Sequence, residues 1–516
     1  MKRAHGLFAG CGVLLLAAGA ALSWWASRGY SEKQYVVDAG TCRLELTMLE
    51  KSSTMPEADS VVLFHGLAAN RKIMENLARV FAEMGVRVFV PDLPGHGGSK
   101  GPFTPQRAEE CSLSLLRGLA ARGMIDPEHT LLVGHSMGGA IALRIAPKFR
   151  PAGVIAISPA PMVAAHGVAP ENLLYRDPPP LLPNTLILAS QIEPRGLRAN
   201  AEDLAATRQD GTVRFKLIPW NTHVGVLFSK TVARECQDWA KGVFHRTETA
   251  GHLPSEANVL GGVLGIAGIV LLAVPFLWEM FGKEKIKEKE VDAAPRKVEE
   301  TPKELPSVLR AGLEYAGVSI AVMLLLKYWV PLRFIRLFEG DYLASFFLIV
   351  GVVLIWFHWN LVKTGARAKA GLLLSPAVAG IILHLLVTGW FALTVTGSWL
   401  TAERWLRFPV FFVAAFVFLY ALELVLGPAE EKHGARRVML SLFYLGMAWA
   451  VLAAGAFYFH SGQIMVVLLA PFLVLFSIFL RMGAQLVRRL STSPAVAAVF
   501  GAILLAGLCL VLFPVS

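Results

Sequence analysis

The sequence predicts an α/β domain with a mainly parallel sheet and helices on both faces, followed by an all-α polytopic transmembrane bundle. Two observations predict this division. Short apolar strands alternate with helical segments between residues 31 and 245, which is the pattern of parallel strands joined by crossover helices. Residues 258–516 consist instead of apolar runs of roughly 20 residues separated by short basic loops, which is typical of membrane helices.

The composition supports a membrane location and argues against nucleic-acid binding. Hydrophobic residues make up 55% of the 516 residues and charged residues only 17%, which is more apolar than is usual for soluble proteins. The net charge of +11 does not reside on the α/β domain, because residues 31–250 hold 24 Lys and Arg against 22 Asp and Glu. A nucleic-acid surface needs clustered basic residues there, so we expect no nucleic-acid partner.

Composition shifts along the chain predict four domains. They are an N-terminal transmembrane anchor at 1–30, the α/β domain at 31–245, a linker at 246–257 and a multi-pass domain at 258–516. The multi-pass domain holds about eight apolar segments, at about 258–281, 307–331, 342–363, 371–397, 407–427, 438–459, 463–481 and 494–514. The lysine-rich stretch at 282–306, which also carries acids, predicts a solvated cytoplasmic loop.

Basic residues between the apolar segments predict the orientation in the membrane. An N-terminus in the cytoplasm puts three Lys and Arg clusters on that side, at 363–369, 432–437 and 481–489. Four arginines, at 333, 336, 404 and 407, then fall outside, so the agreement is incomplete. With this orientation the α/β domain lies on the extracytoplasmic face, and we expect a bacterial inner membrane.

The first apolar segment, residues 6–25, is compatible with a cleaved signal peptide or an uncleaved anchor. Trp24 and Trp25 suit the membrane interface, so they favour the anchor. Three cysteines in the α/β domain, Cys42, Cys111 and Cys236, allow at most one disulfide there. No C-x-x-C or His/Cys cluster occurs, so we expect no metal and no cofactor.

A serine on a tight turn is the chemical centre of the α/β domain. Residues 130–133 predict a buried strand, residues 140–146 predict a helix, and Gly134-His135-Ser136-Met137-Gly138 between them fits the pattern G-x-S-x-G. Such a turn holds the serine hydroxyl at the edge of the sheet and directs the N-terminus of the helix at the group under attack. The flanking glycines are needed because a side chain would clash as the turn closes.

A serine nucleophile needs a base and an acid that orients the base. Glu193 follows the predicted strand at 185–189, and His223 follows the predicted strand at 213–218, which gives the chain order serine, acid, histidine. We therefore expect Ser136, His223 and Glu193 to form a triad. The remaining candidates for the acid are Asp177, Asp203 and Asp210. The backbone N–H groups of Leu67 and Met137 are the expected oxyanion donors.

Three segments occur in a characteristic order: Phe64-His65-Gly66-Leu67, Val-Pro-Asp-Leu-Pro-Gly-His-Gly-Gly-Ser at 90–99, and Gly-His-Ser-Met-Gly-Gly at 134–139. They resemble the monoacylglycerol-lipase and serine-aminopeptidase-like branch of the α/β-hydrolase superfamily over roughly residues 35–243. The resemblance implies the α/β-hydrolase fold and serine-dependent hydrolysis. Two features depart from that branch. The acid is Glu193 where aspartate is usual, and only 27 proline-rich residues lie between Ile157 and Thr185, which implies a minimal cap.

The expected function is that of a membrane-anchored serine hydrolase. It would cleave a carboxylic ester of a lipid or an acylated envelope molecule through an acyl-enzyme, so its expected partners are that ester substrate and membrane lipids. A peptidase or a thioesterase would use the same triad and stays an alternative. A function of a different class also stays open, in which the bundle is a transporter or a scaffold and the outer domain senses or binds a ligand. Ionisable residues within the apolar segments, such as His384 and Glu423, are the observation behind this alternative.

Overall fold

The computed structural model describes residues 2–52, 59–162, 173–247, 252–291, 308–364, 373–394, 401–433, 446, 449–452, 454, 464–491 and 493–516. The chain divides into two compact units. The sheet unit comprises residues 19–263, 391–399 and 514–516, and the helical unit comprises 1–18, 264–390 and 400–513. Each unit is described below by itself.

The sheet unit is built on an eight-stranded sheet with the strand order β1-β2-β4-β3-β5-β6-β7-β8. The first strands form antiparallel pairs, β1 with β2 and β2 with β4, and all later neighbours are parallel. This arrangement confirms the predicted mainly parallel α/β fold. The strands are β1 (Tyr30–Ala39), β2 (Cys42–Lys51), β3 (Ser60–Phe64), β4 (Arg87–Pro91), β5 (Thr130–His135), β6 (Gly153–Ile157), β7 (Thr185–Ile192) and β8 (Val213–Thr222).

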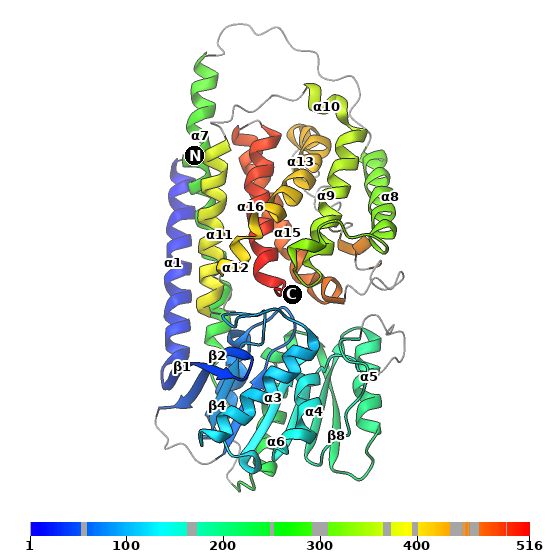
Figure 1. Ribbon diagram of the computed structural model, residues 1–516. Helices are drawn as coiled ribbons and strands as arrows, with labels where there is room; N and C mark the ends of the chain where they lie inside the picture. The colour runs from blue at the N-terminus through cyan, green and yellow to red at the C-terminus, as the bar shows by residue number, and fades with distance from the viewer. Residues whose placement is uncertain are drawn as a thin grey trace. The chain divides into compact units, whose positions relative to one another are not determined.

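Helices cover both faces of the sheet because its central strands β3, β5 and β6 are buried along their whole length. On one face, alternate apolar side chains of these strands pack against α2 and α6. In Figure 1, α3 and α4 cross the front of the sheet. The helices are α2 (Glu75–Ala82), α3 (Pro105–Ala121), α4 (Met137–Phe149), α5 (Arg195–Ala206) and α6 (Lys230–Val243), with the 3₁₀ turns η1 (Arg71–Met74), η2 (Pro127–His129) and η4 (Gly225–Phe228).

The connection between β6 and β7 is the segment in which the sequence predicts a minimal cap. Its described residues, 158–162 and 173–184, contain no helix and no strand. The remaining ten residues of the predicted minimal cap, 163–172, lie outside the part of the chain that the structure describes.

A disulfide joins Cys42, the first residue of β2, to Cys111 on α3. The two Cα atoms are 5.6 Å apart and the bond closes a separation of 69 residues. Cys236 is a buried free thiol. The sequence allowed one bond among these three cysteines, and the position of α3 beside β1 and β2 decides which pair forms it.

The described chain contains six helices long and apolar enough to cross a membrane. They lie at Arg3–Ser27, Ala257–Gly282, Gly340–Phe357, Leu374–Thr394, Phe408–Val425 and Pro494–Leu512, and a shorter apolar helix covers Gly312–Leu326. The apolar half is therefore helical as expected. The helices are α1 (Lys2–Ser27), α7 (Ala257–Val291), α8 (Val308–Leu326), α9 (Gly340–Phe357), α10 (Trp359–Thr364), α11 (Leu374–Thr394), α12 (Ala402–Trp405), α13 (Phe408–His433), α15 (Ile464–Ser491) and α16 (Pro494–Leu512).

The structure describes two predicted segments of this half, 282–306 and 438–459, only in part. The predicted loop at 282–306 begins later than expected, because α7 continues to Val291, and residues 292–306 lie outside the described residues. The lysine-rich and glutamate-rich sequence that suggested a solvated loop also suits a helix, because both residue types have a high helix propensity. Most of the predicted segment at 438–459 also lies outside the described residues.

Small residues allow close packing in the helical unit. A Cβ atom on Gly351 of α9 would lie 2.7 Å from the backbone nitrogen of Phe418 on α13, so the two backbones approach one another at this glycine. The rings of Phe347 and Phe418 pack beside it, with centroids 4.8 Å apart. A Cβ atom on Gly12 of α1 would similarly lie 3.0 Å from the carbonyl oxygen of Gly268 on α7.

An ion pair lies inside the helical unit. Arg481 of α15 donates through Nη1 to Glu423 Oε1 of α13, and the two side chains are 2% and 1% exposed. The sequence marked Glu423 as an ionisable residue within an apolar segment but gave it no partner. The pairing shows why a carboxylate is tolerated there, since a buried charge needs an opposite charge beside it.

Replacing Glu423 by alanine should destabilise the full-length protein by about 3–5 kcal/mol, because Arg481 would keep a buried charge without its carboxylate. Thermal unfolding of the detergent-solubilised protein measures this loss. The double replacement Glu423→Met with Arg481→Met should restore most of the stability, and Arg310→Met, which removes an exposed cation, should change it by less than about 1 kcal/mol. Equal stability of the Glu423→Ala and Arg310→Met variants would contradict this account of the ion pair.

Candidate active site

Ser136 occupies the sharp turn between β5 and α4, as predicted. Its backbone has φ 53° and ψ −116°, a conformation that a residue with a side chain seldom adopts. The turn is held in place because the Ser136 N–H donates to the carbonyl of Ile157 (2.9 Å) and its carbonyl accepts from Ala160 N–H (2.8 Å). A Cβ on Gly134 would overlap the carbonyl of Gly138, so the glycine is required here for close approach.

The structure brings Ser136, His223 and Glu193 together, although they lie on three different connections of the sheet. The distance from His223 Nε2 to Ser136 Oγ is 3.0 Å, and the distance from His223 Nδ1 to Glu193 Oε2 is 2.8 Å. A carboxylate can only accept a hydrogen bond, so Nδ1 carries the proton and donates to Glu193, and Nε2 presents its lone pair to the serine hydroxyl. The hydroxyl therefore donates to the base in the arrangement that general-base activation requires.

Glu193 directly follows an irregular end of β7. The pairing of β7 with β8 shifts register between Ser190 and Ile192, one residue before the glutamate. Glu193 Oε1 accepts the Ser190 N–H (3.0 Å), which leaves Oε2 for the imidazole, and its side chain is 1% exposed. Both oxygens of this buried carboxylate thus have defined donors.

The three alternative acids lie elsewhere. Asp210 accepts from Arg208 and Thr212 in the turn before β8, Asp177 is exposed and Asp203 lies on α5. None of them contacts His223 in the bonds that the structure records for that ring, which go to Ser136 and Glu193. The geometry therefore selects Glu193 from the four candidates.

His135 has a role that the sequence did not suggest, because it fills the variable position of the G-x-S-x-G pattern. Its Nε2 donates to the backbone carbonyl of His223 (2.7 Å), and the two ring centroids are 5.0 Å apart. Burial, together with the neighbouring His223, lowers the pKa of His135 to about 3. The ring is therefore neutral at physiological pH and supports the base as a hydrogen-bond donor.

Replacing His135 by phenylalanine should lower kcat by about 10- to 100-fold, because a buried carbonyl left without a donor costs about 1–3 kcal/mol and His223 would lose its support. KM should change little, since His135 positions the base and does not contact substrate. Steady-state kinetics separates the two constants. His135→Gln, whose amide can donate in the same direction, should recover part of kcat; an equal loss in both variants would contradict a role through this hydrogen bond.

The two expected oxyanion donors belong to segments that adjoin Ser136. Met137 is the first residue of α4, so its N–H belongs to the group of helix N-terminal amides without partners inside the helix. Leu67 follows Gly66, and a Cβ on Gly66 would lie only 3.1 Å from the Ser136 Cβ. The loop after β3 therefore runs directly beside the serine, where a developing negative charge would form.

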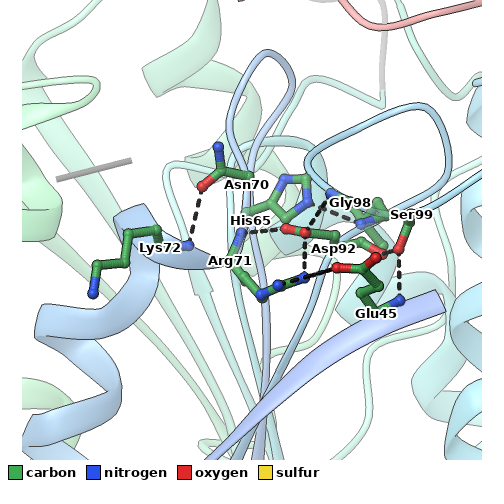
Figure 2. Close-up of polar contacts among 9 residues, drawn as sticks. Glu45, His65, Asn70, Arg71, Lys72, Asp92, Gly98 and Ser99 are labelled. Atoms are coloured by element: carbon green, nitrogen blue, oxygen red, sulfur yellow. Dashed lines mark hydrogen bonds and ion pairs between the residues drawn. The ribbon is translucent and has the colours of Figure 1, made fainter. Parts of the chain in front are cut away.

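Buried polar contacts fix that loop, as Figure 2 shows. Asp92 accepts from the Arg71 N–H (2.7 Å), from Arg71 Nη1 (2.6 Å) and from the Gly98 N–H (2.9 Å). Glu45 accepts from the same guanidinium, with Nη1 and Nη2 at 3.1 and 3.2 Å. Arg71 thereby ties the loop that carries Leu67 to the loop that follows β4.

His65 makes a second connection between these loops. The Leu93 N–H donates to His65 Nε2 (3.0 Å), so Nδ1 carries the proton and donates to the Gly66 carbonyl (2.8 Å). Burial lowers the pKa of His65, which keeps the ring neutral and preserves this pattern. His65 therefore connects the two loops, and the sequence did not predict the contributions of Arg71 and Glu45.

Among the described residues, no group of three or more His, Cys, Asp or Glu side chains could hold a metal ion. The chemistry that the site supports directly is nucleophilic attack by a serine hydroxyl on a carbonyl carbon, with an imidazole as base.

Comparison with known proteins identifies the fold of this part of the chain. Residues 61–258 match the family model described as "Alpha/beta hydrolase family", a range that is less than half of the chain. The matched range contains the strands β4 to β8 and all but the first residue of β3. Together with the strand order, this match shows that the sheet unit has the α/β-hydrolase fold.

Individual relatives are similar over shorter segments. The chain is 32% identical to the mouse sn-1-specific diacylglycerol lipase ABHD11 over 117 residues, 22% of this chain and 36% of that protein. It is 31% identical to an uncharacterised abhydrolase domain-containing protein of Dictyostelium discoideum over 165 residues, 31% of this chain and 17% of that protein. The matches thus span well under two thirds of these relatives.

Among solved structures, the serine hydrolase without lid XC6422 from Xanthomonas campestris superimposes with a TM-score of 0.34 at 16% identity. The superposition covers 42% of this chain and 97% of that protein.

Proposed function

We propose that this protein is a membrane-anchored serine hydrolase that cleaves a carboxylic ester of a lipid or an acylated envelope molecule. The observation that carries the proposal is the hydrogen-bonded series from Ser136 Oγ to His223 Nε2 (3.0 Å) and from His223 Nδ1 to Glu193 (2.8 Å). The lipase among the relatives, which acts on diacylglycerol by its name, is consistent with an ester substrate.

In the proposed mechanism, His223 takes the proton of Ser136 as Oγ attacks the carbonyl carbon of the ester. The backbone N–H groups of Leu67 and Met137 stabilise the oxyanion, and Glu193 stabilises the imidazolium that forms. The protonated His223 then donates to the leaving alcohol, which leaves an acyl group on Ser136. A water molecule, deprotonated by His223, attacks this acyl-enzyme and releases the acid.

Turnover by the purified full-length protein tests the proposal. A p-nitrophenyl butyrate ester, the matched thioester and the matched anilide should be hydrolysed in that order of preference, and Ser136→Ala should abolish hydrolysis of the ester. Preference for the anilide or thioester would replace the esterase by a peptidase or thioesterase. Ester hydrolysis that persists in Ser136→Ala, or its absence in the wild-type protein, would contradict the proposed function.

We also propose that the hydrolase domain lies on the extracytoplasmic face. The disulfide between Cys42 and Cys111 supports this side, because such bonds persist in oxidising compartments and are rare in the cytoplasm. The test uses two single-cysteine substitutions, Lys33→Cys and Asn360→Cys, both at exposed positions. In both variants the free cysteines Cys11, Cys236 and Cys509 are replaced by serine. In intact cells, the cysteine at position 33 should react with a membrane-impermeant thiol reagent, and the cysteine at position 360 should not. The opposite labelling would reverse the topology.

A further inference from the structure

Large apolar side chains lie exposed beside the acid and the base of the candidate triad. Ile192, directly before Glu193, is 52% exposed; Val224, directly after His223, is 36% exposed; and Trp220 is 85% exposed. Ile192 pairs with Thr222 across β7 and β8, which brings the segments carrying these residues together. We call Ile192, Trp220 and Val224 the apolar rim.

The backbone holds Trp220 outward at a conformational cost. Its φ of 55° lies in the left-handed region, which a bulky side chain seldom adopts. The conformation is fixed because the Trp220 N–H donates to the Gln191 side-chain oxygen (3.1 Å). An exposed indole in a disfavoured backbone conformation next to a catalytic candidate points to a role in binding, since packing does not require it.

Cationic groups adjoin the same glutamine. Arg198 of α5 donates through Nη1 to the Gln191 backbone carbonyl (3.3 Å), and Arg195, the first residue of α5, is exposed. The first turn of α5 contains no acidic residue. Gln191, two residues before the acid of the candidate triad, therefore contacts both the backbone of Trp220, which carries the exposed indole, and the guanidinium of Arg198.

We propose that the apolar rim, with Arg195 and Arg198, binds an anionic acylated lipid whose ester reacts with Ser136. This inference rests on the proposed function and names the substrate class of that same site. The acyl chain would lie against Trp220, Ile192 and Val224, which removes apolar surface from water, and the anionic headgroup would lie near the arginines. A Trp beside cations is the combination that suits the boundary between acyl chains and headgroups.

The apolar rim and the two arginines together favour an anionic acylated lipid over a short soluble ester and over a neutral acylglycerol. A short soluble ester would leave the apolar rim uncovered, and a neutral acylglycerol would leave the two arginines without a counter-charge. The six apolar helices of the same chain, if they span a bilayer, would keep the site supplied with lipid.

The chain-length preference of the full-length protein in lipid nanodiscs tests the apolar rim. The key variant is Trp220→Asn, because asparagine tolerates the left-handed backbone and removes only the indole. The matched control is Val36→Asn on β1, at the other edge of the sheet, where an exposed valine is replaced. Substrates are 4-methylumbelliferyl butyrate and 4-methylumbelliferyl palmitate, which share a leaving group.

Trp220→Asn should lower kcat/KM for the palmitate at least 10-fold, mainly through KM, and should lower kcat/KM for the butyrate by a smaller factor, because the shorter chain covers less of the apolar rim. Val36→Asn should change neither. An unchanged ratio of palmitate to butyrate turnover in Trp220→Asn would overturn the inference while leaving the proposed function standing. If the wild-type protein shows no hydrolysis of the butyrate that depends on Ser136, the proposed function fails, and this inference fails with it.

The headgroup contribution has its own test. Wild-type release of fatty acid from dipalmitoyl phosphatidylglycerol should be at least 5-fold faster than release from dipalmitoyl phosphatidylcholine, each lipid being presented in nanodiscs. The double variant Arg195→Gln with Arg198→Gln should lose this difference, whereas Arg117→Gln, an exposed arginine on α3, should keep it. Equal rates on the two lipids in the wild-type protein would show that the site takes neutral acyl esters and would overturn the anionic part of the inference.

Discussion

Replacing His223 by alanine should lower ester turnover by about 10⁴- to 10⁶-fold, because Ser136 would lose the group that accepts its proton and later protonates the leaving alcohol. The residual rate would come from the oxyanion donors and from binding. His223 lies at the edge of the sheet, so the folded structure should survive the change. Measurements of kcat with p-nitrophenyl butyrate, together with the thermal unfolding midpoint, separate loss of catalysis from loss of folding.

The control for this prediction is His252→Ala, which removes an exposed imidazole of the linker and should leave kcat within about 2-fold of the wild-type value. A His223→Ala protein that unfolds at the wild-type temperature and keeps more than a tenth of the wild-type turnover would contradict the assignment of the base.

Replacing Glu193 by glutamine should lower kcat by about 10³- to 10⁴-fold. The amide can donate to His223 Nδ1, which would stabilise the tautomer with its proton on Nε2, and that nitrogen could no longer accept the proton of Ser136. The change is nearly isosteric, so the packing around this buried side chain should be kept. Glu193→Asp should be intermediate, because the charge remains but the shorter side chain no longer reaches Nδ1 at 2.8 Å from the same backbone position.

The matched controls are the three other carboxylates that the sequence allowed as the acid. Asp177→Asn, Asp203→Asn and Asp210→Asn should each keep kcat within about 3-fold of the wild-type value, since none contacts the imidazole. A severe loss in one of these variants, with Glu193→Gln active, would transfer the role of the acid to that aspartate.

The convergence of Ser136, Glu193 and His223 could be predicted because parallel strands end at the same edge of a sheet. Each of the three residues follows a strand, and the strands β5, β7 and β8 lie within one sheet with β6 between the first two. The chain order of a nucleophile, an acid and a base therefore indicated Ser136 and His223 and favoured Glu193, but it left three aspartates as alternative acids until distances were known. The strands themselves were recognisable as short apolar runs.

The contacts that support the triad could not be predicted in the same way. His135 bonds to the carbonyl of His223, 88 residues away, and it occupies a position that accepts many residue types. Arg71 joins Asp92 to Glu45 only because β2 pairs antiparallel with β4, with Leu46 opposite Pro91. Such pairings depend on register, and the periodicity of a single sequence does not determine the register between distant strands.

The same limitation applies to the disulfide and to the ion pair of the helical unit. Three cysteines in the α/β domain left three possible pairs, and the packing of α3 near the start of β2 selects Cys42 and Cys111. Glu423 and Arg481 are separated by 58 residues on helices of which the sequence revealed only the apolar character. Helix rotation and packing decide which polar side chains meet, and neither follows from hydropathy.

The central claim is that Ser136 is a nucleophile activated by His223, and covalent trapping tests it most directly. The full-length protein is treated with an alkyl fluorophosphonate, digested and analysed by tandem mass spectrometry. We predict a phosphonyl adduct on Ser136 that forms rapidly in the wild-type protein, at least about 10³-fold more slowly in His223→Ala, and not at all in Ser136→Ala. An adduct on another residue, or labelling of Ser136 at the same rate without His223, would contradict the claim.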